Sequence, residues 1–198
     1  METKPLIEHK KYRWFFTSSG KLVVGGKSSE QNDELLKKLK GAKKDYVAMH
    51  TSAPGSPFSV IIEEPSNVKE SDIEETAIFT GCFSRAWKLK KKKALVDIFK
   101  LSQLQKTKQM KVGTWSVKGG VLKKTVFLEL ALTKQENKLR AVPLSTIKNK
   151  KNILLKITPG KIDKVEMLPK IQLEIKESLS QEELLQALPA GGVAITRK

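Results

Sequence analysis

Five lysines lie within six residues near the middle of the chain, and these side chains are the ones best suited to bind a ligand. They are Lys88, Lys90, Lys91, Lys92 and Lys93. Clustered cations bind a polyphosphate strongly because they release several condensed counterions together. Residues 88–124 contain twelve lysines and one acid, whereas residues 63–75 contain six acids and one lysine. Lysines that served only solubility would be spread evenly, so this segregation favours a nucleic-acid site, with Arg85 and Lys106 as supporting contacts.

Two tryptophans, Trp87 and Trp115, flank the lysine run. Exposed aromatic rings beside cations can stack on bases. A tryptophan is more often a core residue, however, and a lysine run at the end of a helix is also favoured by the helix dipole. We therefore expect both tryptophans in the core and keep the lysines as the binding residues.

His50 and the loop at residues 51–57 form a second candidate contact. The loop has two prolines and one glycine, so it cannot pair as a strand and is held stiffly. We expect His50, Gly55 and Ser56 to contact the same ligand as the lysines. His50 could also act as a general base with Ser56 and Asp45 near it in sequence, but a lone histidine is more often a structural residue. The sequence therefore predicts no catalysis.

Other motifs exclude further classes of site. Gly25-Gly-Lys-Ser28 resembles the end of a phosphate-binding loop, but Lys21 stands where that loop needs its first glycine, so a turn before a helix is predicted. Two histidines and one cysteine, Cys82, cannot build a four-ligand zinc site, and we expect neither metal nor cofactor. The single cysteine indicates a reducing compartment. The first 20 residues lack a signal-peptide pattern and no stretch is long enough to cross a bilayer, which predicts a cytoplasmic protein without a membrane partner.

Length and composition predict one main domain. A chain of 198 residues can bury one substantial core and a small appendage, and its 39% hydrophobic content is too high for a disordered protein. The formal net charge of +17 indicates a polyanionic partner, with nucleic acid ahead of an anionic membrane.

The pattern of elements predicts an α+β fold: a mixed, mainly antiparallel sheet with two packed helices, and a C-terminal β-rich extension that ends in a short helix. Ser28 or Ser29 caps the first helix, and the capping box Ser71-Asp-Ile-Glu74 begins the second. Strands are expected at residues 12–18, 22–24, 45–50, 58–62, 94–99, 112–118, 121–132 and 152–157, and helices at 29–40, 71–87 and 180–188. The basic stretch 148–151 is expected as an exposed loop. We divide the chain into a nucleic-acid-binding domain at 9–125 and an accessory extension at 126–198.

Several segments, in order, resemble the NFACT-R domain of ribosome quality-control proteins. They are Trp14-Phe-Phe-Thr-Ser18, Gly25-Gly-Lys-Ser-Ser-Glu-Gln-Asn32, Asp45-Tyr-Val-Ala-Met-His50, Pro54-Gly-Ser56, Ser84-Arg-Ala-Trp87, Gln103-Leu-Gln-Lys-Thr107 and Gly113-Thr-Trp-Ser-Val-Lys-Gly119. The resemblance covers about residues 9–120. It implies an RNA-binding module that acts on tRNA or ribosomal RNA in translation or ribosome-associated quality control, with RNA and possibly the ribosome as partners.

Two alternatives of other classes stay open. The first is a DNA-binding protein, since attraction to phosphate does not distinguish the two sugars. The second is an enzyme acting on RNA with His50 as its base. Competition between tRNA and duplex DNA distinguishes the first alternative, and an RNA turnover that is lost in His50→Ala while binding survives distinguishes the second.

Overall fold

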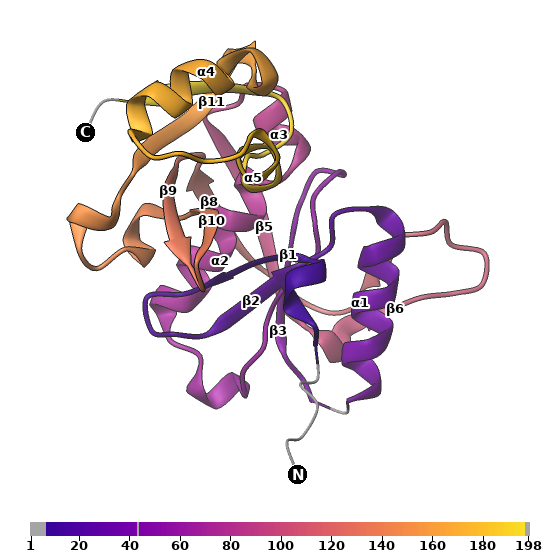
Figure 1. Cartoon of the computed structure of the whole chain (residues 1–198). Helices are drawn as coiled ribbons and strands as arrows, with labels where there is room; N and C mark the ends of the chain where they lie inside the picture. Colours follow the sequence, from indigo (N-terminus) through magenta and orange to yellow (C-terminus); the bar gives the residue numbers. More distant parts are fainter. Residues whose placement is uncertain (1–6, 43, 197–198) are drawn as a thin grey trace.

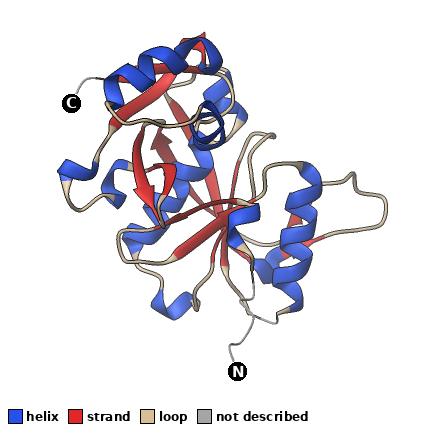
Figure 2. Ribbon diagram, viewed as in Figure 1, coloured by secondary structure: helices blue, strands red, loops and turns tan. Residues whose placement is uncertain are grey.

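Two antiparallel sheets with helices packed against them make up the molecule (Figures 1 and 2). The computed structural model describes residues 7–42 and 44–196, so the last two residues of the expected extension lie outside the described part. The predicted α+β class with a mainly antiparallel sheet is confirmed.

The first sheet has six strands, and two of the predicted site residues, His50 and Lys93, lie on them. In spatial order the strands are β1 (Arg13–Phe16), β2 (Leu22–Gly25), β4 (Ser59–Ile61), β3 (Val47–Thr51), β5 (Lys93–Lys100) and β8 (Leu122–Phe127). A two-stranded ribbon of β6 (Leu104–Gln105) and β7 (Ser116–Val117) follows β5 in the chain. Single 3-10 turns are η1 (His9–Lys11), η2 (Pro65–Asn67), η3 (Leu101–Gln103), η4 (Leu144–Thr146) and η5 (Lys150–Asn152).

Two helices cover the opposite faces of the first sheet. Successive residues of a strand point to opposite faces, so Trp14 packs in the cluster that holds the leucines of α1 (Ser29–Gly41), and Phe15 packs in the cluster that holds Phe79 of α2 (Glu70–Cys82). The side chain of Ser28 accepts a hydrogen bond from the backbone of Gln31 at 3.2 Å and caps α1 as expected.

The helix expected at residues 71–87 is interrupted. It ends at Cys82, and a separate one-turn helix, α3 (Arg85–Lys88), begins after Ser84. The Ser84 hydroxyl donates to the Gly81 carbonyl at 2.7 Å and accepts from the backbone N–H of Ala86 at 3.1 Å. Ser84 thus closes one helix and caps the next, which re-aims the chain before the lysine run.

The strand expected at residues 121–132 is two strands in different sheets. Apolar residues occur on both sides of the break, but β8 ends at Phe127 and β9 (Leu130–Gln135) begins the second sheet. The strand expected at 112–118 reduces to the two residues of β7. Around Phe127 the apolar residues indicated extended chain correctly but could not show where the pairing changes, whereas residues 112–115 are turn and irregular chain with Val112 exposed.

The second sheet has the order β10 (Lys138–Val142), β9, β11 (Leu155–Asp163) and β12 (Gly192–Thr196). It is packed by α4 (Lys164–Ile175) and α5 (Gln181–Ala187), which lie at one end of the molecule in Figure 1. The extension therefore ends in a strand and not in the expected helix. The sequence analysis missed α4 because Pro169 lies inside it, although Met167, Ile171 and Ile175 follow a helical spacing.

One continuous core joins the two sheets. A single cluster of buried side chains includes Phe15 and Phe79 from the first part and Leu132, Ile171 and Leu188 from the second. The loop at 148–151 is exposed, as expected, but it lies between β10 and β11 of the second sheet and does not separate the two parts. Residue 125 lies within β8.

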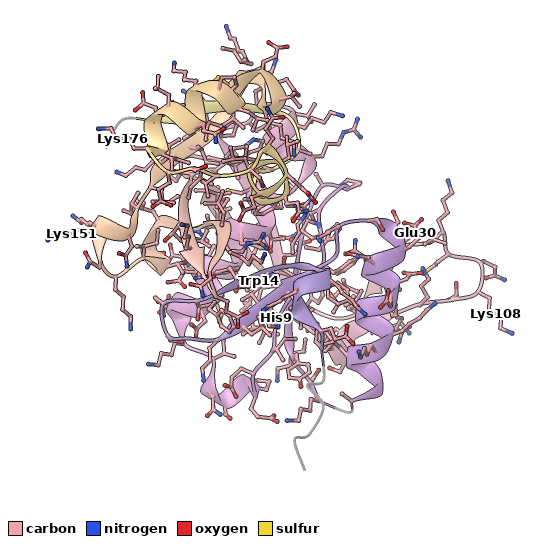
Figure 3. The ribbon with its side chains drawn as sticks, viewed as in Figure 1. His9, Trp14, Glu30, Lys108, Lys151 and Lys176 are labelled. Carbon is pink, nitrogen blue, oxygen red and sulfur yellow. The ribbon has the colours of Figure 1, made fainter. Side chains whose placement is uncertain are left out.

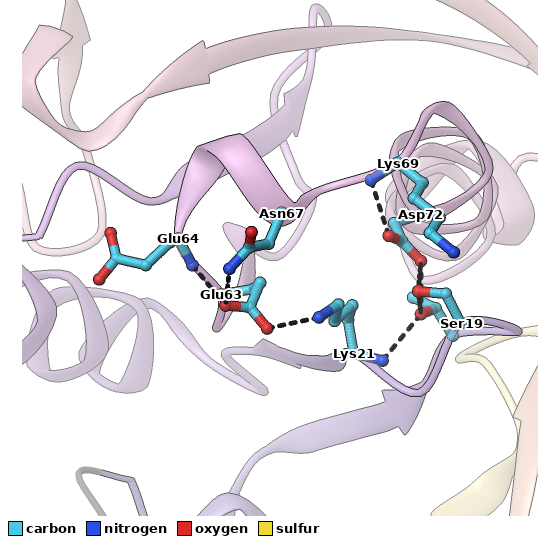
Figure 4. A network of polar contacts seen from close by, with 8 residues as sticks. Ser19, Lys21, Glu63, Glu64, Asn67, Lys69 and Asp72 are labelled. Atoms are coloured by element: carbon cyan, nitrogen blue, oxygen red, sulfur yellow. Dashed lines mark hydrogen bonds and ion pairs between the residues drawn. The ribbon is translucent and has the colours of Figure 1, made fainter.

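The acidic segment at residues 63–75 is bound within the molecule (Figure 4). Glu63 pairs with the Lys21 ammonium at 2.6 Å, and Asp72 accepts hydrogen bonds from the hydroxyls of Thr17 and Ser19 at 2.6 Å each. The Asp72 contacts fasten the β1–β2 turn to α2, and the Glu63 contact fastens it to the segment after β4. The hydrogen bond from Lys21 lowers the pKa of Glu63 to about 2.

A shortened chain tests the shared core. Removal of residues 128–198 would expose Phe79 and Trp87, and the first sheet would lose the layer that covers α2. We expect the 1–127 chain to show no cooperative thermal transition, because loss of large buried side chains is among the most destabilising changes. Circular dichroism of the purified fragment measures this, and a sharp transition like that of the full chain would instead support an autonomous first unit.

Acid titration tests the Glu63 contact. A glutamate in an unfolded chain has a pKa of about 4.3, whereas that of Glu63 in the folded protein is about 2. Between these two values the unfolded state binds more protons than the folded state, so the stability falls as the pH falls. We expect Glu63→Gln to lose stability at pH 6 and to show a flatter decline from pH 5 to pH 2. Urea unfolding across this range measures the slope, with Glu166→Gln on the exposed side of α4 as the matched control. Equal slopes for all three proteins would contradict this assignment.

Candidate nucleic-acid interface

A tight turn after α3 presents the lysine run to solvent. The backbone N–H groups of Leu89, Lys90 and Lys91 donate to the carbonyl oxygens of Arg85, Trp87 and Ala86 at 2.9–3.0 Å. Lys90 adopts a left-handed conformation with φ of 58°, which is the usual way to end a helical turn. Since β5 begins at Lys93, all five lysines surround one bend.

The cations of this bend are exposed and unpaired. Arg85, Lys88, Lys90, Lys91, Lys92 and Lys93 are all exposed, and none of the six forms an ion pair with an acid in the described part of the chain. Lys123 and Lys124 of the basic stretch are paired, with Asp97 at 2.6 Å and with Glu74 at 3.5 Å. Other exposed lysines of this stretch, namely Lys100, Lys108, Lys111 and Lys118, also form no ion pair within the described residues, but they are spread along the chain, whereas six cations lie within residues 85–93.

Lys106 is not part of this exposed group. Its ammonium pairs with Asp33 at 2.8 Å, with 17% of the lysine side chain and 10% of the aspartate side chain exposed. The Asp33 carboxylate also accepts hydrogen bonds from Trp115 Nε1 at 2.8 Å and from the Gly113 backbone at 3.0 Å. Lys106 and Trp115 thus anchor their loop to α1, and sequence spacing gave no sign of this partner on a distant helix.

The loop at 51–57 lies directly against α3, as the sequence analysis required for a shared site. The Gly55 carbonyl accepts a hydrogen bond from the Arg85 backbone at 2.6 Å. Gly55 has φ of 97°, and a Cβ at this position would lie 3.0 Å from Arg85 Cβ. The close approach and the positive φ both require glycine here.

A groove of about 470 Å³ runs between this loop and the bend. Its floor is apolar, with Leu89 and Leu95 exposed by 55% and 42%, and Lys91 and Lys93 lie along it. The groove therefore combines apolar surface with cations, which is the composition that contacts both bases and phosphates.

The side chains of Ser56 and His50 form hydrogen bonds to backbone groups of their own loop and strand. The Ser56 hydroxyl accepts from the Thr51 backbone at 2.9 Å and donates to the Pro57 carbonyl at 3.1 Å, and the residue is 9% exposed. His50 Nδ1 donates to the Thr51 carbonyl at 2.7 Å, and its ring centroid lies 4.5 Å from that of Phe58. Burial lowers the pKa of His50, so the ring is neutral at pH 7 and adds no charge to the site.

The residues considered as catalytic partners of His50 bind elsewhere. The Asp45 carboxylate accepts from the Ser102 backbone at 2.8 Å and from the Ser102 hydroxyl at 3.0 Å. Neither Asp45 nor Ser56 hydrogen-bonds to His50 within the described residues. A base, its orienting acid and a nucleophile are therefore not assembled around this histidine.

The aromatic side chain at the site is Phe127, which the sequence analysis missed. Trp87 is fully buried, as expected, whereas Phe127 is 66% exposed. Phe127 is the β8 partner of Lys93, whose ammonium lies 4.4 Å from the centre of the ring. The expected strand at 121–132 concealed this residue inside an apolar run, although the alternation with buried Val126 marks Phe127 as outward-facing.

We define the α3–β5 surface as the exposed cations of the bend together with this ring. Its members are Arg85, Lys88, Lys90, Lys91, Lys92, Lys93 and Phe127. None of the helices in residues 7–42 and 44–196 is long and apolar enough to cross a bilayer. Within the same residues no three His, Cys, Asp or Glu side chains are grouped to hold a metal.

The fold and this surface define an α+β module in which a bend carries exposed cations without ion pairs in the described residues, and the neighbouring strand β8 carries an exposed aromatic ring. Residues 11–119 match the family described as the NFACT protein RNA binding domain. The match spans more than half of the chain, and the chain therefore belongs to this family, which confirms the resemblance stated from the sequence.

Two known proteins extend the comparison. The chain is 29% identical over 204 residues to the archaeal Rqc2 homolog aRqcH of Methanocaldococcus jannaschii, across 96% of this chain and 29% of that protein. The chain thus spans less than a third of the relative, and the aligned part includes the second sheet. The C-terminal structure of the fibronectin/fibrinogen-binding protein from Streptococcus suis shares the fold, with a TM-score of 0.50, 22% identity and coverage of 65% of this chain and 49% of that one.

Replacement of Asp33 tests the anchor beneath the loop. We expect Asp33→Asn to destabilise the protein by about 2–3 kcal/mol, because a poorly exposed carboxylate that accepts several hydrogen bonds loses its charge and leaves Lys106 unpaired. Lys108→Gln is the control, since Lys108 projects from the tip of the same loop (Figure 3) and should leave urea unfolding unchanged. Equal effects of the two substitutions would contradict the anchoring role.

Proposed function

We propose that this chain binds RNA, either tRNA or ribosomal RNA, through the α3–β5 surface, and that it does so without catalysis of its own. The single observation that carries this proposal is the group of six exposed cations around one bend, none of which has an acidic partner within the described residues. Membership of a family described by RNA binding supports the choice of ligand.

The surface offers two kinds of contact to RNA. The lysines neutralise backbone phosphates, which fixes the position of the strand without reading its sequence. Phe127 and the apolar floor of the groove offer a flat surface on which an unpaired base can stack. Unpaired bases are common in RNA loops, so this combination suits a structured RNA better than a uniform duplex.

The relative named as an Rqc2 homolog supports a role in ribosome-associated quality control. We propose that the chain acts on RNA at the ribosome in the cytoplasm, as a binding module in translation or in that quality-control process. The hydrogen bonds of Asp45 and Ser56 to groups other than His50, within the described residues, support a role in binding and not in turnover of RNA.

Charge removal at the bend tests the proposal. We expect the combined substitutions Lys90→Gln, Lys91→Gln, Lys92→Gln and Lys93→Gln to weaken tRNA binding by about ten-fold or more, because each lost phosphate contact removes a counterion-release contribution. The slope of log affinity against log salt should fall by roughly three to four units. The melting temperature should hardly change, since solvated lysines contribute little to folding.

The matched control removes the same charge elsewhere. Gln at Lys148, Lys151, Lys170 and Lys176 changes four exposed lysines, two of which are labelled in Figure 3. Fluorescence anisotropy at several salt concentrations compares both variants with the parent. If the control variant binds tRNA as weakly as the bend variant, the protein binds RNA as a diffuse polycation without a defined site. If duplex DNA competes better than tRNA, the surface is assigned to DNA.

A further inference from the structure

A second group of cations lies in a small pocket where the first sheet meets the second. Arg13 comes from β1, Lys27 from the loop after β2, and Arg140 from β10. The pocket has a volume of about 120 Å³, and Trp14, which is labelled in Figure 3, forms part of its wall. None of these cations belongs to the α3–β5 surface.

The two arginines stack on aromatic rings and keep their N–H edges free. The guanidinium carbon of Arg13 lies 4.7 Å from the centre of the Phe83 ring, and that of Arg140 lies 4.8 Å from the centre of the Trp14 ring. Two guanidinium groups carry about ten N–H donors. Within the described residues one of these is used, from Arg140 Nε to the Leu139 carbonyl at 2.6 Å.

The positive charge in this pocket is not compensated. Neither arginine forms an ion pair in the described part of the chain. Glu183 also lines the pocket, but its carboxylate accepts from the backbone and hydroxyl of Ser180 at 3.3 Å and caps α5. Lys10 lines the pocket as well, and it pairs with Glu136 at 3.4 Å.

The cations of this pocket lower one another's pKa values. Burial, and then the charge of Arg140, lower the pKa of Arg13 to about 10. Loss of solvent, and then the charges of Arg13 and Arg140, lower the pKa of Lys27, and burial followed by the charge of Arg13 does the same to Lys164. Stacking on a ring accounts for one face of each guanidinium. The two arginines are still half-buried like charges with unused N–H donors, and this arrangement costs free energy unless an anion lies between them.

We propose that Arg13, Lys27 and Arg140 form a site for a single phosphate group. Planar guanidinium groups match the oxygens of a phosphate with paired, charge-assisted hydrogen bonds. A volume of about 120 Å³ lies well below the roughly 300 Å³ of sites for drug-sized ligands, so the pocket takes one phosphate and no attached base or sugar inside it. The group belongs either to an RNA chain or to a free phosphate ion.

The site joins the two parts of the molecule. Arg13 and Lys27 lie within the residues that match the family, and Arg140 lies beyond them on the second sheet. A phosphate held by all three would connect β1 to β10 and stabilise the arrangement of the sheets. Phosphate binding at this pocket does not rest on RNA binding at the α3–β5 surface.

Titration with inorganic phosphate tests the site. Calorimetry of the full chain at constant ionic strength should show saturable phosphate binding and a higher melting temperature than in chloride. Arg140→Gln and Lys27→Gln should each weaken this binding ten-fold or more, while Lys161→Gln, an exposed lysine of β11, should not. Lys27 is exposed, so its variant gives the answer even where Arg140→Gln fails to fold. Phosphate that acts no better than chloride, or binding that survives both pocket variants, overturns the proposal.

Competition with RNA identifies the source of the phosphate. If the group belongs to RNA, inorganic phosphate at constant ionic strength should displace tRNA from the parent but not from Arg140→Gln. If it is free phosphate, the ion should bind without displacing tRNA, and either result supports the site. The bend variant with four glutamines should keep its phosphate binding, so failure of the RNA-binding proposal and failure of this one are separately visible.

Discussion

Trp87 is buried in the middle of the core, and its position fixes both the turn that carries the lysines and the strand that closes the second sheet. Its indole N–H donates to the Gly192 carbonyl at 2.9 Å, and none of its surface is exposed. Beside it, Gly191 has φ of 112° and approaches the Lys88 backbone so closely that a Cβ would lie 2.9 Å from Lys88 Cα. The exposed bend is therefore held from below by residues more than a hundred positions away, and its direction depends on the second sheet.

The distribution of unpaired charge depends on which lysines form ion pairs with carboxylates in the folded protein. Acids near residues 63–75 are used to fasten the β1–β2 turn, and Asp33 fastens the long loop at its base. The lysines of the bend are exposed and form no ion pair with these acids in the described part of the chain. The net charge of +17 is thus unevenly distributed, and its densest group is the six cations of the bend, none of which forms an ion pair within the described residues.

Local signals predicted the parts of the fold that local chemistry determines. Ser28 and Gly41 predicted the bounds of α1 closely, and the consecutive lysines predicted exposed cations, which the structure has at this bend. The break at Ser84 falls inside residues 71–87, which were predicted as one helix, and the change of sheet after Phe127 lies in an apolar run that fits one strand equally well. The pairing of Lys106 with Asp33 and the meeting of Arg13 with Arg140 depend on contacts between distant segments, which residue spacing does not encode.

The two groups of cations differ physically in the recognition they can support. The lysines of the bend are solvated and flexible, so their attraction to phosphate is long-ranged, tolerant of geometry and screened by salt. The arginines of the pocket are partly buried and held on aromatic rings, so their donors point in fixed directions and are screened much less. A polyanion would be gathered by the first group irrespective of its sequence, whereas only a phosphate of the right size and orientation satisfies the second. Because the pocket is shared between the sheets, an anion bound there also acts on the core that supports the bend.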